Sequence, residues 1–259
     1  MFKYGIKIWS VNKDWFSEVV ELIKQGKADF VEIYLVPSSF KLSDFDIFKQ
    51  NNIQVSLHCP HTSHNFDVFN LTKKSLDIWN NQVVKTADYL NSQFIILHPG
   101  IGENKETFKR ESLKIKDSRV LMESMVKVGF VGVEEGGVMC FGYSKEELEF
   151  IHKDCGFDIC FDVCHSLASA AWQKIDSYDF ISECIDLLKP RYFHLAGGNI
   201  EDETDRHLDL WEGNFDYKFI KEKLAKAQQA EDIYLSFEVP KKGDGLENDL
   251  KNIEYFKNL

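Results

Sequence analysis

The sequence predicts an α/β protein: a single (β/α)8 (TIM) barrel spanning residues 1–259, with a metal site at the C-terminal ends of its strands. Three observations lead to this prediction. Eight short β-rich runs alternate with longer amphipathic stretches, no Pro/Gly/Ser-rich linker divides the chain, and successive strand ends carry His, Asp or Glu. Eight βα units without a domain break favour closure into a barrel over an open doubly wound sheet.

The predicted strands are short runs rich in β-branched and aromatic residues. In chain order they are Tyr4–Trp9, Phe30–Leu35, Gln54–His58, Phe94–His98, Gly132–Glu135, Asp158–Asp162, Tyr192–Ala196 and Tyr234–Glu238.

Between these strands, apolar residues recur at spacings of three and four, which is typical of helices. We expect Asp14, Ser144 and Ser177 to be N-caps. The clearest predicted helices are Trp15–Gln25, Leu71–Leu90, Lys145–Lys153, Tyr217–Gln229 and Leu246–Lys257.

Composition narrows the functional classes. The net charge of −11 and the pI of about 5.2 count against non-specific coating of nucleic acid, but they leave room for recognition around a metal cluster. The six cysteines form no CxxC pair, so neither a zinc ribbon nor a redox pair is indicated. Six cysteines in a chain of this length are typical of reduced thiols in a cytosolic protein. The N-terminus lacks a secretory pattern and no run resembles a membrane span, so we expect a cytoplasmic protein with no membrane partner.

Six predicted strand ends in succession present His, Asp or Glu, and barrel enzymes assemble their active sites from such ends. Several imidazoles and carboxylates in one barrel mouth are costly unless a divalent cation compensates for desolvation and like-charge repulsion. Nitrogen and oxygen donors without cysteine favour zinc, with manganese or iron as competitors. The residues at these strand ends and in the segments that follow them are His58, His98, Glu134, Glu135, Asp162, His165, His194, Asp205, His207 and Glu238, of which Asp205 and His207 lie in the loop after the seventh strand.

Two stretches carry a family resemblance. FDVCH, which contains Asp162 and His165, and DRHLDLWEGN, from Asp205 to Asn214, resemble the endonuclease IV family (AP endonuclease family 2), within the wider superfamily of xylose isomerase-like barrels. The resemblance extends from Gln54 to Glu238. It implies a monomeric, zinc-dependent hydrolase that cleaves the DNA backbone 5′ to abasic sites in base excision repair.

The resemblance also implies three zinc ions held by nine side chains, each with a candidate in this sequence. Glu134, Glu238 and His98 are expected to be catalytic, acting on a metal-activated hydroxide that attacks phosphorus. By resemblance, His58 and His98 hold the first zinc, Glu134 bridges to the second, Asp162, His194 and Glu238 complete the second, and His165, Asp205 and His207 hold the third.

The sequence departs from the family around the substrate. The loop from Val36 to Asp44 has Lys41 as its only cation where family members carry arginine. His61 replaces a tyrosine that penetrates the duplex, and Glu135 replaces an asparagine. We expect His61, Arg206 and Lys241 to contact the substrate, which is damaged DNA or a phosphorylated sugar.

Two other functions stay open. A sugar or sugar-phosphate isomerase or epimerase would use one metal, with Glu134 and Glu238 as the proton-shuttling pair. A non-catalytic metal- or sugar-binding barrel is the third possibility, since fold alone does not fix function. The full set of nine ligand candidates favours the hydrolase.

Overall fold

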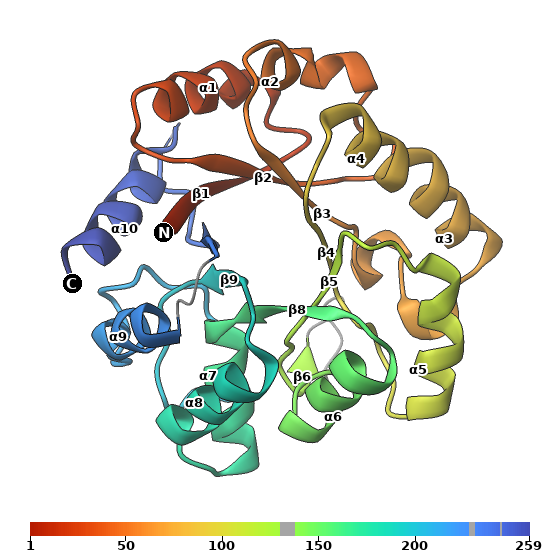
Figure 1. The fold of residues 1–259 in the computed structure, drawn as a ribbon, viewed down its shortest axis with the longest axis vertical. Helices are drawn as coiled ribbons and strands as arrows, with labels where there is room; N and C mark the ends of the chain where they lie inside the picture. Colours follow the sequence, from red (N-terminus) through yellow and green to blue (C-terminus); the bar gives the residue numbers. More distant parts are fainter. Residues whose placement is uncertain (130–137, 228–230, 244) are drawn as a thin grey trace.

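Eight parallel strands close into a barrel in the order β1-β10-β9-β8-β5-β4-β3-β2, and helices surround them (Figure 1). The computed structural model describes residues 1–129, 138–227, 231–243 and 245–259. The barrel strands are Phe2–Trp9 (β1), Phe30–Tyr34 (β2), Val55–His58 (β3), Ile95–Leu97 (β4), Val120–Glu123 (β5), Asp158–Asp162 (β8), Tyr192–Leu195 (β9) and Ile233–Phe237 (β10). The predicted (β/α)8 fold is confirmed.

Helices and short turns connect the strands. π-Helical turns at Trp79–Val84 and Phe150–Asp154 continue α3 and α6, respectively, and a short hairpin pairs β6 (Val128–Gly129) with β7 (Val138–Met139). No helix in the described part of the chain combines the length and hydropathy that a membrane span requires. The α-helices are Phe16–Lys24 (α1), Asp46–Gln50 (α2), Lys73–Ile78 (α3), Lys85–Leu90 (α4), Lys105–Ser112 (α5), Lys145–Glu149 (α6), Val163–Gln173 (α7), Ser177–Leu188 (α8), Tyr217–Ala227 (α9) and Glu247–Asn258 (α10).

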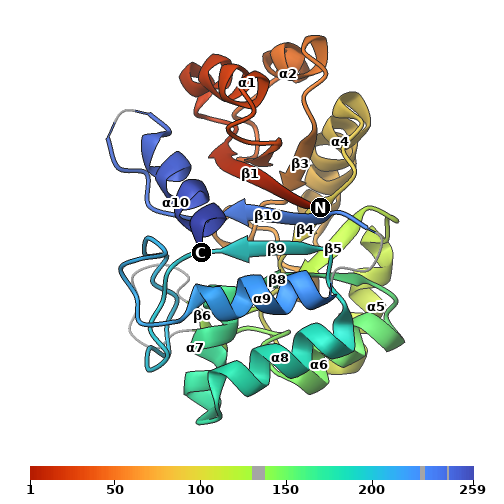
Figure 2. The same ribbon diagram turned by 60° about the vertical axis from the view of Figure 1, so that its left-hand side comes forward.

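Parallel pairing brings the C-terminal strand ends to one end of the barrel. Tyr34 at the end of β2 pairs with His58 at the end of β3, and Asp162 at the end of β8 pairs with His194 in β9. Figure 2 shows β9 and β10 side by side, running in the same direction. The side chains at these strand ends therefore converge.

An aromatic cluster fills the barrel interior near the strand starts. The ring of Phe30 packs edge-on against Tyr192 and Tyr234, with ring centroids 5.8 and 5.5 Å away. A Cβ on Gly5 would lie 2.3 Å from the Phe30 ring, so only glycine fits there. Because side chains alternate across a strand, the next inward residue of β2 is Glu32, and polar groups fill the barrel above the aromatic cluster.

Seven of the eight predicted strands coincide with barrel strands, but the fifth is wrong. The strand between β4 and β8 is Val120–Glu123, whereas the predicted strand Gly132–Glu135 falls at positions outside the described residues. Both segments place glutamate after apolar residues, so the pattern alone does not separate them. Only three apolar residues precede Glu123, and they follow a charged turn.

The N-cap predictions have mixed outcomes. Ser144 accepts a hydrogen bond from the backbone N–H of Glu147 and caps α6 as predicted. Ser177 is wrong because Asp176 accepts the backbone N–H groups of Tyr178 and Asp179. Asp14 is also wrong, since it lies inside a 3-10 turn, Lys13–Trp15, that precedes α1.

We expect Asp176→Ala to destabilise the protein by about 1 kcal/mol, because it removes the acceptor for two N–H groups at the start of α8. Ser177→Ala is the matched control and should cost less. Urea unfolding followed by circular dichroism measures both variants. A larger loss of stability for Ser177→Ala would restore the original cap prediction.

Candidate metal centre

The structure brings eight of the nine predicted ligands together at the C-terminal end of the barrel; the ninth, Glu134, lies outside the described residues. Glu123, which the sequence analysis did not identify, lies at the centre of the cluster. The eight are His58, His98, Asp162, His165, His194, Asp205, His207 and Glu238.

Both oxygens of the Glu123 carboxylate face imidazoles. Oε2 lies 3.0 Å from His58 Nε2 and 3.1 Å from His98 Nε2, while Oε1 lies 3.0 Å from His194 Nδ1. The carboxylate is fully buried at the end of β5. A carboxylate with its two oxygens directed at two groups of donors has the geometry of a bridging ligand. His58, His98 and Glu123 form the first donor group.

The second donor group lies deeper, at the ends of β5, β8, β9 and β10. Nδ1 of His194 lies 2.8 Å from Glu238 Oε1 and 3.7 Å from Asp162 Oδ2. Asp162 Oδ2 is buried without a hydrogen-bond partner, whereas its Oδ1 accepts the backbone N–H of His165 at 2.7 Å and caps α7. Because buried polar atoms are rarely left unpaired, the Oδ2 atom of Asp162 is available to bind a metal ion. The group comprises Glu123, Asp162, His194 and Glu238.

The third donor group joins the start of α7 to the loop after β9. Oδ2 of Asp205 lies 2.8 Å from His207 Nε2 and 3.4 Å from His165 Nε2. Reciprocal backbone hydrogen bonds between Gly197 and Leu208, at 2.6 and 3.0 Å, hold this loop against β9. Asp162 also belongs to this group, so the three groups are contiguous.

The electrostatics of the cluster favour cations. Burial and the Lys7 ammonium lower the pKa of His58 to about 4, so its imidazole is neutral at neutral pH and able to bind metal. Burial opposes ionisation of Glu123, but His194 and His98 nevertheless hold its pKa well below the ordinary value. Despite burial, Asp162 and Asp205 raise the pKa of His165 to about 10, so metal binding there would release a proton.

The donor chemistry fits divalent transition metals. The three groups offer imidazole nitrogen and carboxylate oxygen. The donor atoms lie within 4.8 Å of one another in the first and second groups and among Asp162, His165 and His207 of the third, to which Asp205 is joined by its ion pairs with His165 and His207. Glu32, His58, His194 and Glu238 meet the same distance. This mixture suits zinc, manganese or iron. The orphaned Oδ2 of Asp162 supports the same conclusion.

Two cavities adjoin the donor groups. The first, of about 340 Å³, is lined by donor residues together with Trp9, Tyr34 and His61. The second, of about 330 Å³, is lined by Lys7, Trp9, Arg206 and Lys241, among others.

The three residues predicted to contact the substrate differ in how exposed they are and in the partners they already have. The His61 ring stacks on His98 with centroids 5.3 Å apart, and burial lowers its pKa to about 2. Arg206 is largely exposed, with its Nε 3.6 Å from Asp202. Lys241 lines the second cavity, but its ammonium binds the buried Asp249. His61 and Arg206 are therefore better placed than Lys241 to meet a substrate.

Four functional candidates besides Glu123 escaped the sequence analysis: Lys7, Trp9, Glu32 and Tyr34. All lie on β1 or β2, at alternating inward positions. A charged residue between two apolar residues of a strand, as in IKI or VEI, is the signal that could have found Lys7 and Glu32.

Comparisons with known proteins bear on the fold of this chain. A family model described as "Xylose isomerase-like TIM barrel" matches residues 20–259. The protein named "Endonuclease 4" from Thermus thermophilus is 26% identical over 148 residues, a match that covers 53% of this chain and 54% of that protein. The match therefore spans about half the length of this relative.

Solved structures share the fold. Endonuclease IV from another strain of Thermus thermophilus has a TM-score of 0.70 at 19% identity, covering 99% of this chain and 98% of that one. An AP endonuclease of family 2 from Brucella melitensis has a TM-score of 0.70 at 14% identity, covering 100% and 99%. L-ribulose 3-epimerase has a TM-score of 0.63 at 15% identity, covering 98% and 86%. At these identities the likeness shows the fold alone.

We expect Glu123→Gln to lower the bound metal per chain, because it removes the carboxylate that joins the first two donor groups. Glu147→Gln, which changes a half-buried carboxylate outside the donor groups, is the matched control and should retain the metal content of the parent protein. Elemental analysis of protein purified with zinc measures both. Equal metal content in Glu123→Gln and Glu147→Gln would contradict the role of Glu123.

Proposed function

The chain belongs to the xylose isomerase-like TIM barrel family, and we propose that it is a zinc-dependent phosphodiesterase that hydrolyses the DNA backbone 5′ to abasic sites. The observation that carries the proposal is the third donor group. A proton transfer at or between carbons beside a carbonyl can be carried out by two acid/base side chains and one metal that polarises the carbonyl, so it leaves the third set of ligands without a role. Phosphodiester hydrolysis spreads charge over several oxygens, and additional cations stabilise that charge.

The donor groups assign the proposed ligands. When bound, the metals would lower the pKa of a water molecule and neutralise charge on the phosphate. His58, His98 and Glu123 would hold the first ion, Glu123, Asp162, His194 and Glu238 the second, and Asp162, His165, Asp205 and His207 the third.

Glu238 and His98 are the proposed catalytic side chains of this chain. Glu238 spans two groups, with Oε1 2.8 Å from His194 and Oε2 3.4 Å from His207 Nε2, and it lines both cavities. It can therefore orient an attacking water while remaining fixed. His98 is partly exposed, lines the first cavity, and places its Nε2 3.1 Å from Glu123 Oε2.

The size and charge of the site bear on the substrate. The first cavity, of about 340 Å³, suits one extruded sugar with its phosphate, as enzymes that flip nucleotides require. Bound cations would concentrate positive charge there although the chain carries −11 overall. The proposed partner is therefore damaged DNA, bound by a monomer through the metals and Arg206.

A sugar or sugar-phosphate isomerase or epimerase is the second candidate. Within the second donor group, Glu123 and Glu238 approach the same atom, His194 Nδ1, at 3.0 and 2.8 Å. Both carboxylates would therefore lie next to a metal ion bound there. With one metal in that group they would form the acid/base pair, and Trp9 would offer an apolar face to a sugar. Glu123 then takes the role that the sequence analysis gave to Glu134.

We expect the zinc-loaded protein to nick an end-labelled duplex containing one abasic analogue. The product should be a single break on the 5′ side of the lesion with a 3′-hydroxyl, and an undamaged duplex should stay intact. A chelator should abolish incision, and zinc should restore it. Metal-loaded protein that leaves the lesion intact but interconverts ketoses would establish the second candidate instead.

We expect His207→Ala to lower the incision rate at least ~100-fold, because it weakens electrostatic stabilisation at the third donor group. Arg206→Ala, at the neighbouring exposed position, is the comparison and should act mainly on KM. Single-turnover and steady-state kinetics separate the two effects. An unchanged single-turnover rate in His207→Ala would contradict the role of the third group.

A further inference from the structure

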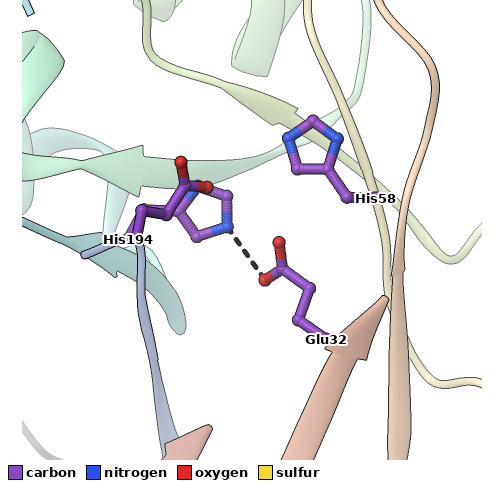
Figure 3. A group of neighbouring side chains, drawn as sticks. Glu32, His58 and His194 are labelled. Atoms are coloured by element: carbon purple, nitrogen blue, oxygen red, sulfur yellow. Dashed lines mark hydrogen bonds and ion pairs between the residues drawn. The ribbon is translucent and has the colours of Figure 1, made fainter. Parts of the chain in front are cut away.

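A fully buried carboxylate, Glu32, lies in the middle of the barrel beneath the donor groups. It is the central residue of β2 and points inward, between the inward-facing Phe30 and Tyr34. Branched apolar side chains usually fill this part of a barrel. Figure 3 shows the Glu32 side chain reaching from β2 towards His194.

Three polar groups surround this carboxylate. Oε2 accepts hydrogen bonds from His194 Nε2 at 2.9 Å and from the Tyr192 hydroxyl at 2.6 Å. Oε1 lies 3.0 Å from the Lys7 ammonium but has no hydrogen-bond partner. Burying a carboxylate without partners would cost several kcal/mol, so the two hydrogen bonds to Oε2 and the ion pair with Lys7 offset the burial of Glu32.

The two nitrogens of His194 have separate roles. Nδ1 faces Glu123, Asp162 and Glu238 in the second donor group, while Nε2 faces Glu32. A neutral imidazole carries one N–H, and a carboxylate acceptor at Nε2 keeps the proton there. If a metal ion displaces the proton on the other nitrogen, the lone pair of Nδ1 would be directed at the second group.

Lys7 extends the same network to another ligand. Its ammonium pairs with both Glu32 and Glu238, and all three side chains are largely buried. The ammonium balances the Glu32 charge and holds the Glu238 carboxylate next to His194. The Lys7–Glu32 ion pair thus contacts two members of the second donor group: Lys7 pairs with Glu238, and Glu32 accepts a hydrogen bond from His194.

We propose that Glu32, with Lys7 as its counter-ion, is a positioning residue that fixes His194 for metal binding through the Glu32–His194 hydrogen bond. The inference rests on the metal centre of the proposed function, but not on the identity of the substrate. Carboxylates that accept the second ring N–H of a ligand histidine commonly strengthen metal binding.

The test measures metal affinity rather than turnover. Glu32→Gln should weaken binding of one zinc ion about 10- to 100-fold in a chelator competition, with the remaining ions unaffected. It should also shift the visible spectrum of the cobalt-substituted protein, because the imidazole orientation changes. Glu147→Gln is the matched control: it removes a half-buried carboxylate that accepts two backbone N–H groups and belongs to none of the donor groups.

Two further variants keep the test decisive. Lys7→Met/Glu32→Gln removes both charges and serves if Glu32→Gln alone does not fold; it should show the same loss of affinity. Lys7→Met alone separates positioning from direct ligation, because Glu32, His58, His194 and Glu238 could themselves surround a cation. Tighter binding by Lys7→Met would not decide this, because Lys7 also pairs with the proposed ligand Glu238. Positioning predicts that the zinc in crystals of Lys7→Met stays on the Nδ1 side of His194, whereas a zinc ion about 2.0–2.2 Å from a Glu32 oxygen would identify Glu32 as a ligand and overturn the proposal.

The outcomes distinguish this inference from the proposed function. Equal zinc affinity in Glu32→Gln and the parent protein, with equal cobalt spectra, would overturn the positioning role alone. Metal-loaded parent protein that leaves abasic DNA intact would overturn the proposed substrate alone. Parent protein that binds no divalent metal would overturn both.

Discussion

The cluster depends on one buried carboxylate. Glu123 has no exposed surface, and its two oxygens contact the imidazoles of His58, His98 and His194 at about 3 Å. Its desolvation must be offset by these partners, so three strands have to deliver their side chains to one point. Barrel closure supplies that convergence, because β5 ends at Glu123 while β3 and β9 bring His58 and His194 to the same end.

Alternation along the strands arranges the interior in layers. On β2 the inward side chains run from Phe30 through Glu32 to Tyr34, and on β9 from Tyr192 to His194. The aromatic layer closes the barrel from below, so the charged layer meets solvent only at the cavities. Because the aromatic layer has low polarity, it strengthens the hydrogen bonds among the charged groups next to it and makes an unpaired charged group costly. The packing of the aromatic core therefore sets the environment in which the charged side chains of the site act.

The features that could be predicted from the sequence are those that follow from the regular spacing of residues. Seven strands, and the ligand candidates at or just after their ends, followed from alternation and strand order. Glu123 could not be predicted because a three-residue apolar run before a glutamate competes with a similar pattern at Gly132–Glu135. Glu32 and Lys7 were missed because parallel strands are buried on both faces, so sequence does not distinguish inward from outward positions.

Three contiguous donor groups would separate a phosphodiesterase from a one-metal isomerase. Anomalous diffraction at the zinc edge, from crystals of protein purified with zinc, locates each bound ion. We expect three peaks: one among His58, His98 and Glu123, one beside His194 and Glu238, and one beside His165 and His207. A single peak beside His194, with none near His207, would rule out the third donor group as a metal site.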